Sequence, residues 1–105
     1  MKLTKIHSDD CEVCVSLGDT AKVLADEKGF EYGKVDLTDL AQNNSPLRDY
    51  VINVYVKPND GMIDLPIYLI STDEGVIQGS GVVKDLEEVT NLITSWSQWA
   101  NSQKQ

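Results

Sequence analysis

The chain has 105 residues, of which 41% are hydrophobic, and its formal net charge is −8. This length and apolar content suit one compact domain with a single core, so we expect residues 1–105 to form one domain that ends in a polar tail at residues 101–105. The negative charge disfavours nucleic acid and an anionic membrane surface as partners, because both would repel the chain.

The first predicted element is a short strand from Lys2 to His7, where apolar and polar residues alternate moderately. It ends at Ser8-Asp9-Asp10, three residues that can each cap a helix. We therefore expect a helix from about Cys11 that ends at Gly29. In such a helix, one face carries Cys14, Leu17, Ala21, Leu24 and Lys28.

A second strand is predicted to end at Asp36, since the apolar residues before it have strand-like spacing. Strand, helix and strand then form a βαβ unit, for which parallel strands and a right-handed crossover are the default. Ser45-Pro46 is a good cap pair, and helical spacing follows it, so a second helix is predicted from about Ser45 to Val54 or Tyr55. Lys57 to Gly61 is predicted to be a surface loop.

The last part of the chain predicts an antiparallel hairpin followed by a long helix. The hairpin strands are Ile67 to Ser71 and Val76 to Gly81, joined by a turn that contains Gly75. The helix runs from about Lys84 to Ala100, and an apolar stripe along it includes two tryptophans that we expect to pack against the core. The predicted order is β-α-β-α-β-β-α, a mixed sheet with helices on both faces.

Cys11 and Cys14, the only two cysteines, follow the first predicted strand and stand three residues apart. In the first turn of a helix, residues at this spacing are neighbours, so a disulfide can close and reopen with little backbone movement. The start of a helix also favours a thiolate, which is the species that attacks a disulfide. We therefore predict that Cys11, nearer the helix start, attacks and that Cys14 resolves the mixed disulfide.

The two cysteines have other possible uses. A structural disulfide across so short a loop removes little entropy from the unfolded chain, and the segment from Met1 to Lys5 shows no apolar signal, so a reducing, cytoplasmic location is expected. Cys11, Cys14 and His7 supply three zinc ligands, but no second cysteine pair or later histidine completes a site, so we expect no metal. An inert pair of buried thiols stays open as an alternative.

The order of elements, with Cys-x-x-Cys after the first strand and a proline before the third, resembles the thioredoxin-like family, close to its minimal glutaredoxin form. This resemblance covers almost the whole chain and implies an α/β fold with a four-stranded mixed sheet flanked by three helices. Asp64-Leu65-Pro66 matches the family segment in which a cis-proline faces the dithiol, so these residues are expected to bind substrate. Gly81 lies in a segment similar to the glycine turn that helps glutaredoxins hold the glutathione carboxylate.

The resemblance implies a small thiol–disulfide oxidoreductase that exchanges its dithiol with disulfides of proteins or small thiols. A reductase or glutathione is expected as the electron donor, with no bound cofactor, no nucleic acid or membrane partner, and a monomeric state. The alternative is a thioredoxin-fold binding module or accessory subunit without redox turnover. The family's buried acid in the first strand is absent from Lys5-Ile6-His7, so His7 is a candidate proton carrier instead.

Charges beside the dithiol predict its redox character. Asp9, Asp10 and Glu12 flank Cys11, and their repulsion of a thiolate is comparable to the helix-start stabilisation of about 0.3–1 kcal/mol. The Cys11 thiolate should therefore gain little, and we expect a reducing couple closer to thioredoxins than to strong oxidants. The same acidic rim should favour basic clients.

Overall fold

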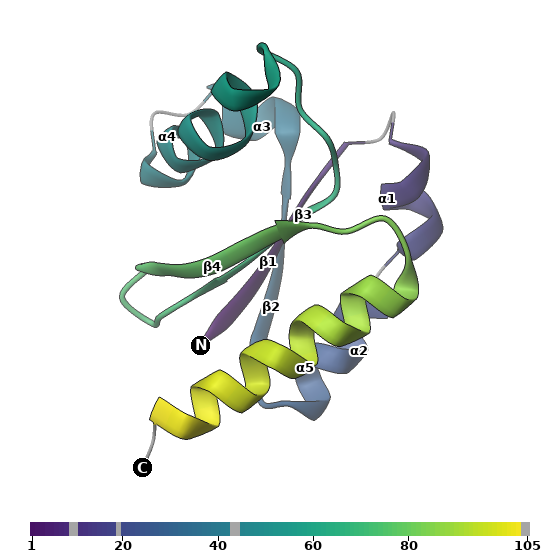
Figure 1. The fold of residues 1–105 in the computed structure, drawn as a ribbon, viewed down its shortest axis with the longest axis vertical. Coiled ribbons are helices and arrows are strands. Elements are labelled where there is room, and N and C mark those ends of the chain that lie inside the picture. The colour runs from purple at the N-terminus through teal and green to yellow at the C-terminus, as the bar shows by residue number, and fades with distance from the viewer. Residues whose placement is uncertain (9–10, 19, 43–44, 104–105) are drawn as a thin grey trace.

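The computed structural model describes residues 1–8, 11–18, 20–42 and 45–103. Its centre is a four-stranded sheet in the order β2-β1-β3-β4 (Figure 1). The strands are β1 (Lys2–His7), β2 (Glu31–Asp36), β3 (Ile67–Ser71) and β4 (Ile77–Val82). β1 and β2 are parallel, whereas β1 with β3 and β3 with β4 are antiparallel. The predicted mixed sheet and hairpin are therefore confirmed.

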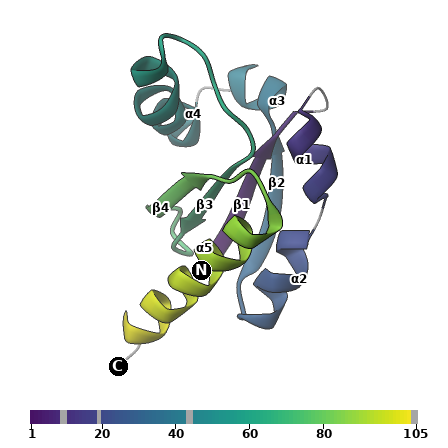
Figure 2. The ribbon, with the colours of Figure 1, turned by 45° about the vertical axis from the view of Figure 1, so that its right-hand side comes forward.

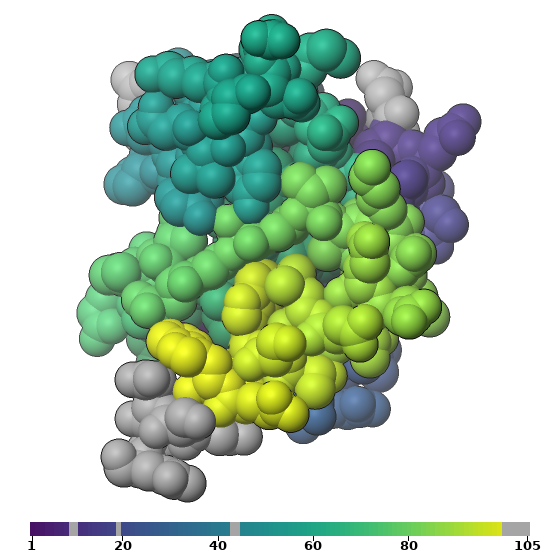
Figure 3. Space-filling view, viewed as in Figure 1, coloured from purple at the N-terminus to yellow at the C-terminus, as the bar shows by residue number. Residues whose placement is uncertain are grey.

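Helices cover both faces of this sheet (Figures 1 and 2). One face carries α1 (Glu12–Leu17), α2 (Thr20–Glu27) and α5 (Leu86–Gln103). The other carries α3 (Leu37–Gln42) and α4 (Pro46–Val51), which continues as a π-helical segment, Ile52–Val56, and a 3-10 turn, Lys57–Asn59. On the surface in Figure 3, β4 lies between the α5 layer and the layer that contains α4.

Strand alternation produces two hydrophobic cores, one on each face. Along β3, Tyr68 and Ile70 join the core under α2 and α5, while Ile67 and Leu69 join the core under α3 and α4. All four side chains are buried, so β3 is buried on both faces, as is usual for a central strand covered by helices. Trp96 and Trp99 pack against the first core, as predicted for the α5 stripe.

The single helix predicted after β1 is wrong, because the structure has two helices separated at Gly18. Gly18 adopts φ 52°, ψ −133°, a conformation that residues with a Cβ rarely reach. The cap prediction is corrected as well, because Cys11 rather than Ser8 is the N-cap of α1; Asp9 and Asp10 lie outside the described residues. The predicted stop at Gly29 is consistent with its φ of 79° just after α2.

The predictions missed helix α3, which starts directly after β2. Its first turn is capped by Asp36, whose Oδ1 accepts a hydrogen bond from the backbone N–H of Thr38 at 2.8 Å. The predicted cap at Ser45 is confirmed, because its Oγ accepts from the N–H of Arg48. The final helix starts at Leu86, slightly later than predicted, and continues to Gln103 instead of ending at Ala100.

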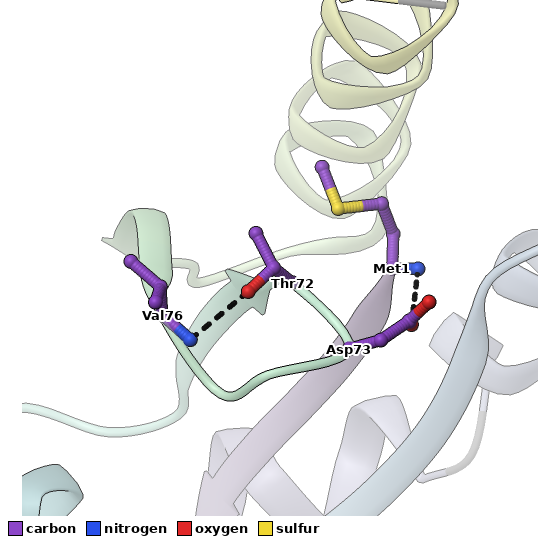
Figure 4. Close-up of polar contacts among 4 residues, drawn as sticks. All are labelled: Met1, Thr72, Asp73 and Val76. Atoms are coloured by element: carbon purple, nitrogen blue, oxygen red, sulfur yellow. Dashed lines mark hydrogen bonds and ion pairs between the residues drawn. The ribbon is translucent and has the colours of Figure 1, made fainter.

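An ion pair joins the start of the chain to the β3–β4 turn (Figure 4). The amino-terminal ammonium of Met1 lies 3.0 Å from Oδ1 of Asp73. Within the same turn, Oγ1 of Thr72 accepts a hydrogen bond from the N–H of Val76 at 3.1 Å. These contacts fix the end of the sheet opposite the cysteines, because β1 runs from Met1 toward Cys11.

Candidate active site

Cys11 and Cys14 form a disulfide at the start of α1, with their Cα atoms 5.2 Å apart. Cys11 is the N-cap residue, and its Sγ accepts a hydrogen bond from the N–H of Cys14 at 3.1 Å. The sulfur therefore occupies the place that an oxygen of Ser or Asp takes in other helix caps. The turn brings both sulfur atoms together without involving any other element.

The two cysteines differ in exposure. Cys11 is partly exposed and lines a surface cavity, whereas Cys14 is a buried residue of α1, only 4% exposed. An incoming disulfide can therefore reach Cys11 more easily than Cys14. This geometry agrees with the predicted order of attack and resolution.

The loop before β3 faces Cys11 and contains the predicted proline. The Leu65–Pro66 peptide bond is cis, as expected, and Pro66 is buried at the start of β3. The Leu65 carbonyl oxygen lies 3.6 Å from Sγ of Cys11, within reach of a thiol donor in the reduced protein. Leu65 therefore lies beside Cys11, and a substrate-binding role for Leu65 and Pro66 stays a prediction.

A surface cavity of about 330 Å³ opens beside Cys11, lined also by Ser8, Leu37, Ile63, Asp64 and Leu65. Asp64 thus lies where predicted, and its Oδ2 is 3.5 Å from the side-chain nitrogen of Asn59. Leu37 and Ile63 are site residues that were not predicted from the sequence. Leu37 was not predicted because helix α3 was not predicted, although Asp36, directly before α3, is a residue type that commonly caps helices.

Leu37 and Ile63 also line a second cavity of about 300 Å³, so the two hollows are adjacent. The second cavity lies among α3, α4 and the π-helical segment, and apart from Arg48 its lining is apolar. Its other lining residues are Leu40, Ala41, Val51, Ile52 and Val56. When a substrate disulfide lies at Cys11, an apolar side chain next to that disulfide in the substrate could therefore bind in the second cavity.

Gly81, the fourth predicted binding residue, does not line the cavity at Cys11. It pairs with Tyr68 in the sheet and borders a different hollow, next to Leu92 of α5. The neighbouring Gly79 has a packing role, because a Cβ on it would lie 2.9 Å from Nε1 of Trp96. Gly81 itself therefore does not line the cavity at Cys11, although Val83 in the same segment donates a hydrogen bond to the Pro66 carbonyl, and a ligand role for Gly81 stays a prediction.

Lys5 lies behind the dithiol and was not identified from the sequence as a site residue. It is 2% exposed, and its Nζ donates hydrogen bonds to the carbonyl oxygens of Cys14 and Gly18. A cavity of about 190 Å³ lies here, lined by Lys5, His7, Ser8, Cys14, Val15, Gly18 and Lys34. The sequence signal that could have identified Lys5 as a site residue was its position in β1, between buried Leu3 and the cysteines.

His7 shares this cavity with Cys14, which places the candidate proton carrier on the side of the buried cysteine. In the part of the chain that the structure describes, no group of three or more His, Cys, Asp or Glu residues is arranged to hold a metal ion.

Two tyrosines join the π-helical region to β4. The hydroxyl groups of Tyr50 and Tyr55 lie 2.7 Å and 2.6 Å from Oγ of Ser80. Burial raises the pKa of the Tyr55 phenol, the hydrogen bond with Ser80 opposes that shift, and the nearby Tyr50 adds to it. This cluster links α4 and the π-helical segment to β4.

Solved structures show which fold this arrangement belongs to. Thioredoxin 1 from the thermophilic eubacterium Thermosipho africanus is similar to this chain with a TM-score of 0.60 at 18% identity, covering 96% of this chain and 99% of that chain. The thioredoxin pre-protein of Schistosoma mansoni gives a TM-score of 0.59 at 15% identity, covering 89% and 75% respectively. Thioredoxin f2, solved in a complex with ferredoxin:thioredoxin reductase, gives 0.58 at 12% identity, covering 90% and 74%.

The chain thus has the thioredoxin fold, and the predicted fold class is confirmed. Its described residues contain five α-helices where three were predicted, since the first predicted helix is divided and α3 is additional. The sequence matches no protein-family model, and no curated protein matches it significantly. Among the described helices, none is both long and apolar enough to cross a membrane.

Proposed function

We propose that the protein is a small thiol–disulfide oxidoreductase that reduces disulfides of proteins or small thiols. The observation that carries this proposal is the different placement of the two paired cysteines. Cys11 borders an open cavity next to the Leu65 carbonyl, whereas Cys14 is buried within reach of it. A nucleophile that substrate can reach and a protected resolving thiol are what disulfide exchange requires.

In the proposed reaction, the Cys11 thiolate attacks one sulfur of the substrate disulfide. A Cys11–substrate mixed disulfide forms and the other substrate sulfur leaves as a thiolate. Cys14, as a thiolate, then attacks Sγ of Cys11, which forms the Cys11–Cys14 disulfide and releases the second substrate thiolate. Two electrons pass from the protein to the substrate, and the protons lost by the cysteines are balanced by those that the substrate thiolates take up from water.

The cavity at Cys11 indicates what a client would look like. An extended segment that runs past the loop at residues 63–65 can hydrogen-bond to its backbone and place an apolar side chain in the adjoining hollow. Exposed Asp64 at the rim and the net charge of −8 favour a segment that is basic outside this apolar residue. The same charge disfavours glutathione, which is anionic, as the preferred substrate.

The electron donor in this proposal is a reductase protein, with glutathione as the alternative donor. Support comes from a structurally similar protein, thioredoxin f2, which was solved in a complex with a reductase. We place the protein as a monomer in the cytoplasm, where thiols are kept reduced and such a couple can turn over.

Turnover of a protein disulfide by the reduced protein tests this function. We expect multiple turnovers with insulin in the presence of dithiothreitol, and a loss of at least about hundredfold when Cys11 is replaced by Ser, because the nucleophile is then missing. Glutathione disulfide, offered at the same concentration, should react more slowly than insulin. Wild-type protein that binds proteins but shows no turnover would instead favour the alternative, a thioredoxin-fold binding module.

A further inference from the structure

Lys5 places a buried amine beside the backbone of the resolving cysteine, Cys14. Its Nζ is 3.0 Å from the carbonyl oxygen of Cys14 and 2.6 Å from that of Gly18. The second distance is at the short end for hydrogen bonds whose donor is charged. Because only 2% of the residue is exposed, water would screen a positive charge on Nζ weakly, and such a charge would act on neighbouring groups more strongly than that of a surface lysine.

The other basic side chains around Lys5 make this region more positive. Lys34 of β2 pairs with Lys5 in the parallel register and lines the same cavity, as does His7 at the end of β1. The titratable groups that the described part of the chain contributes to this cavity are therefore three basic side chains and the Cys14 thiol. A protein with a net charge of −8 thus has a basic hollow behind its dithiol.

We propose that Lys5 is a positioning residue whose ammonium group stabilises the Cys14 thiolate in the resolving step. This inference rests on the proposed function, because it assigns a role within that reaction. The Cys14 thiolate attacks Sγ of Cys11 in the mixed disulfide, and the substrate thiolate leaves. A cation beside the attacking thiolate increases the fraction of Cys14 that is ionised and ready to attack.

The chemistry of lysine also determines what Lys5 does not do. An ammonium group has three donors and no acceptor, so Lys5 cannot take the Cys14 proton in the way that a buried carboxylate would. The proton therefore passes to another acceptor, either water or His7 in the same cavity, and the lysine contributes charge and two hydrogen bonds. Those hydrogen bonds go to the carbonyl oxygens of Cys14 and of Gly18, where the helix breaks. They therefore keep α1 in place above β1.

The pKa of Cys14 in a Cys11→Ser background, followed by the ultraviolet absorbance of the thiolate, tests the role directly. Lys5→Met in this background should raise that pKa by about one unit, a tenfold loss of thiolate at pH values below it. Lys5→Gln keeps a hydrogen-bond donor without the charge and should give a similar rise. Lys5→Arg keeps the charge and should largely preserve the pKa. This readout requires no turnover, so its result is independent of whether the proposed function holds.

Lys2→Met is the matched control, because it removes the same charge from an exposed position on the same strand. It should leave the Cys14 pKa unchanged, which excludes a general effect of net charge. Equal pKa values in Lys5→Gln and Lys5→Arg would overturn the proposal, as would a shift in Lys2→Met as large as that in Lys5→Met. If Lys5→Met does not fold, the comparison of Lys5→Gln with Lys5→Arg decides.

Discussion

Cys11 and Cys14 stand three residues apart, yet the fold gives them different environments. Cys11 caps α1 and borders the open cavity beside Leu65, whereas Cys14 faces β1 and the buried amine of Lys5. The cysteine pair could be predicted from its spacing alone. The environment of Cys14 could not be predicted, because a lysine within a strand is ordinarily on the surface, and only the tertiary packing of α1 over β1 buries Lys5.

This difference predicts the order in which the reduced thiols react. We expect iodoacetamide to label Cys11 well before Cys14, because Cys14 is 4% exposed and the reagent reaches it only after local opening. Timed labelling followed by peptide mass spectrometry identifies the first site. Labelling in denaturant, where both thiols should react at similar rates, is the control; preferential labelling of Cys14 in the native protein would reverse the assigned roles.

At the scale of elements, the contact between β4 and α5 depends on a strand residue without a side chain. A Cβ on Gly79 would lie 2.9 Å from Nε1 of Trp96, too close without movement of the indole or the strand. Gly79→Ala should therefore lower the free energy of unfolding by about 1–3 kcal/mol, measured by urea denaturation.

Gly33→Ala is the matched control for this prediction, since Gly33 is also a strand glycine without a positive φ. A Cβ there would meet the flexible end of the Lys2 side chain, which can move aside at low cost. We expect Gly33→Ala to change stability by less than about 0.5 kcal/mol. Equal losses in the two variants would show that the Trp96 contact does not decide the effect.

The tyrosine cluster between the π-helical segment and β4 predicts a pH dependence. Burial raises the pKa of Tyr55 above its ordinary value, so the folded state favours the neutral phenol. The resulting stability is complete below about pH 10, where the unfolded phenol is also neutral, and is lost as pH rises toward the pKa of the folded state. Unfolding measured in urea from about pH 8 to 11 should show a smaller alkaline loss in Tyr55→Phe than in the wild type. Identical slopes would show that this phenol does not contribute.

The strands and hairpin were predictable from the sequence because alternation, turn residues and Pro66 agree. Two features were not predicted, α3 and the division of the first helix, and each has a physical reason. α3 has a single turn-forming cap, Asp36, which also ends β2, and its six residues are too few to show helical periodicity. Gly18 divides the first helix because it takes a backbone conformation that mainly glycine can adopt. Its carbonyl also accepts a hydrogen bond from Lys5, a contact that no local sequence pattern reveals.

At the scale of the whole molecule, charge should govern how clients approach. The net charge is −8, and exposed Asp64 lies at the rim of the Cys11 cavity, so long-range attraction accelerates encounters with basic proteins. We expect the rate constant for reducing a basic disulfide peptide to fall severalfold between low and physiological salt, measured by stopped flow. An acidic peptide with the same disulfide should show the opposite trend. A shared salt dependence would mean that charge does not steer the encounter.

The central claim is that Cys11 attacks a substrate disulfide and Cys14 resolves the product. The most direct test is to mix reduced Cys14→Ser and Cys11→Ser variants with a disulfide peptide and to follow adducts by mass spectrometry. We predict a stable adduct on Cys11 in the first variant, and at least about hundredfold slower adduct formation in the second, whose remaining thiol is buried. Absence of an adduct on Cys11, or faster capture by Cys14, would contradict the account.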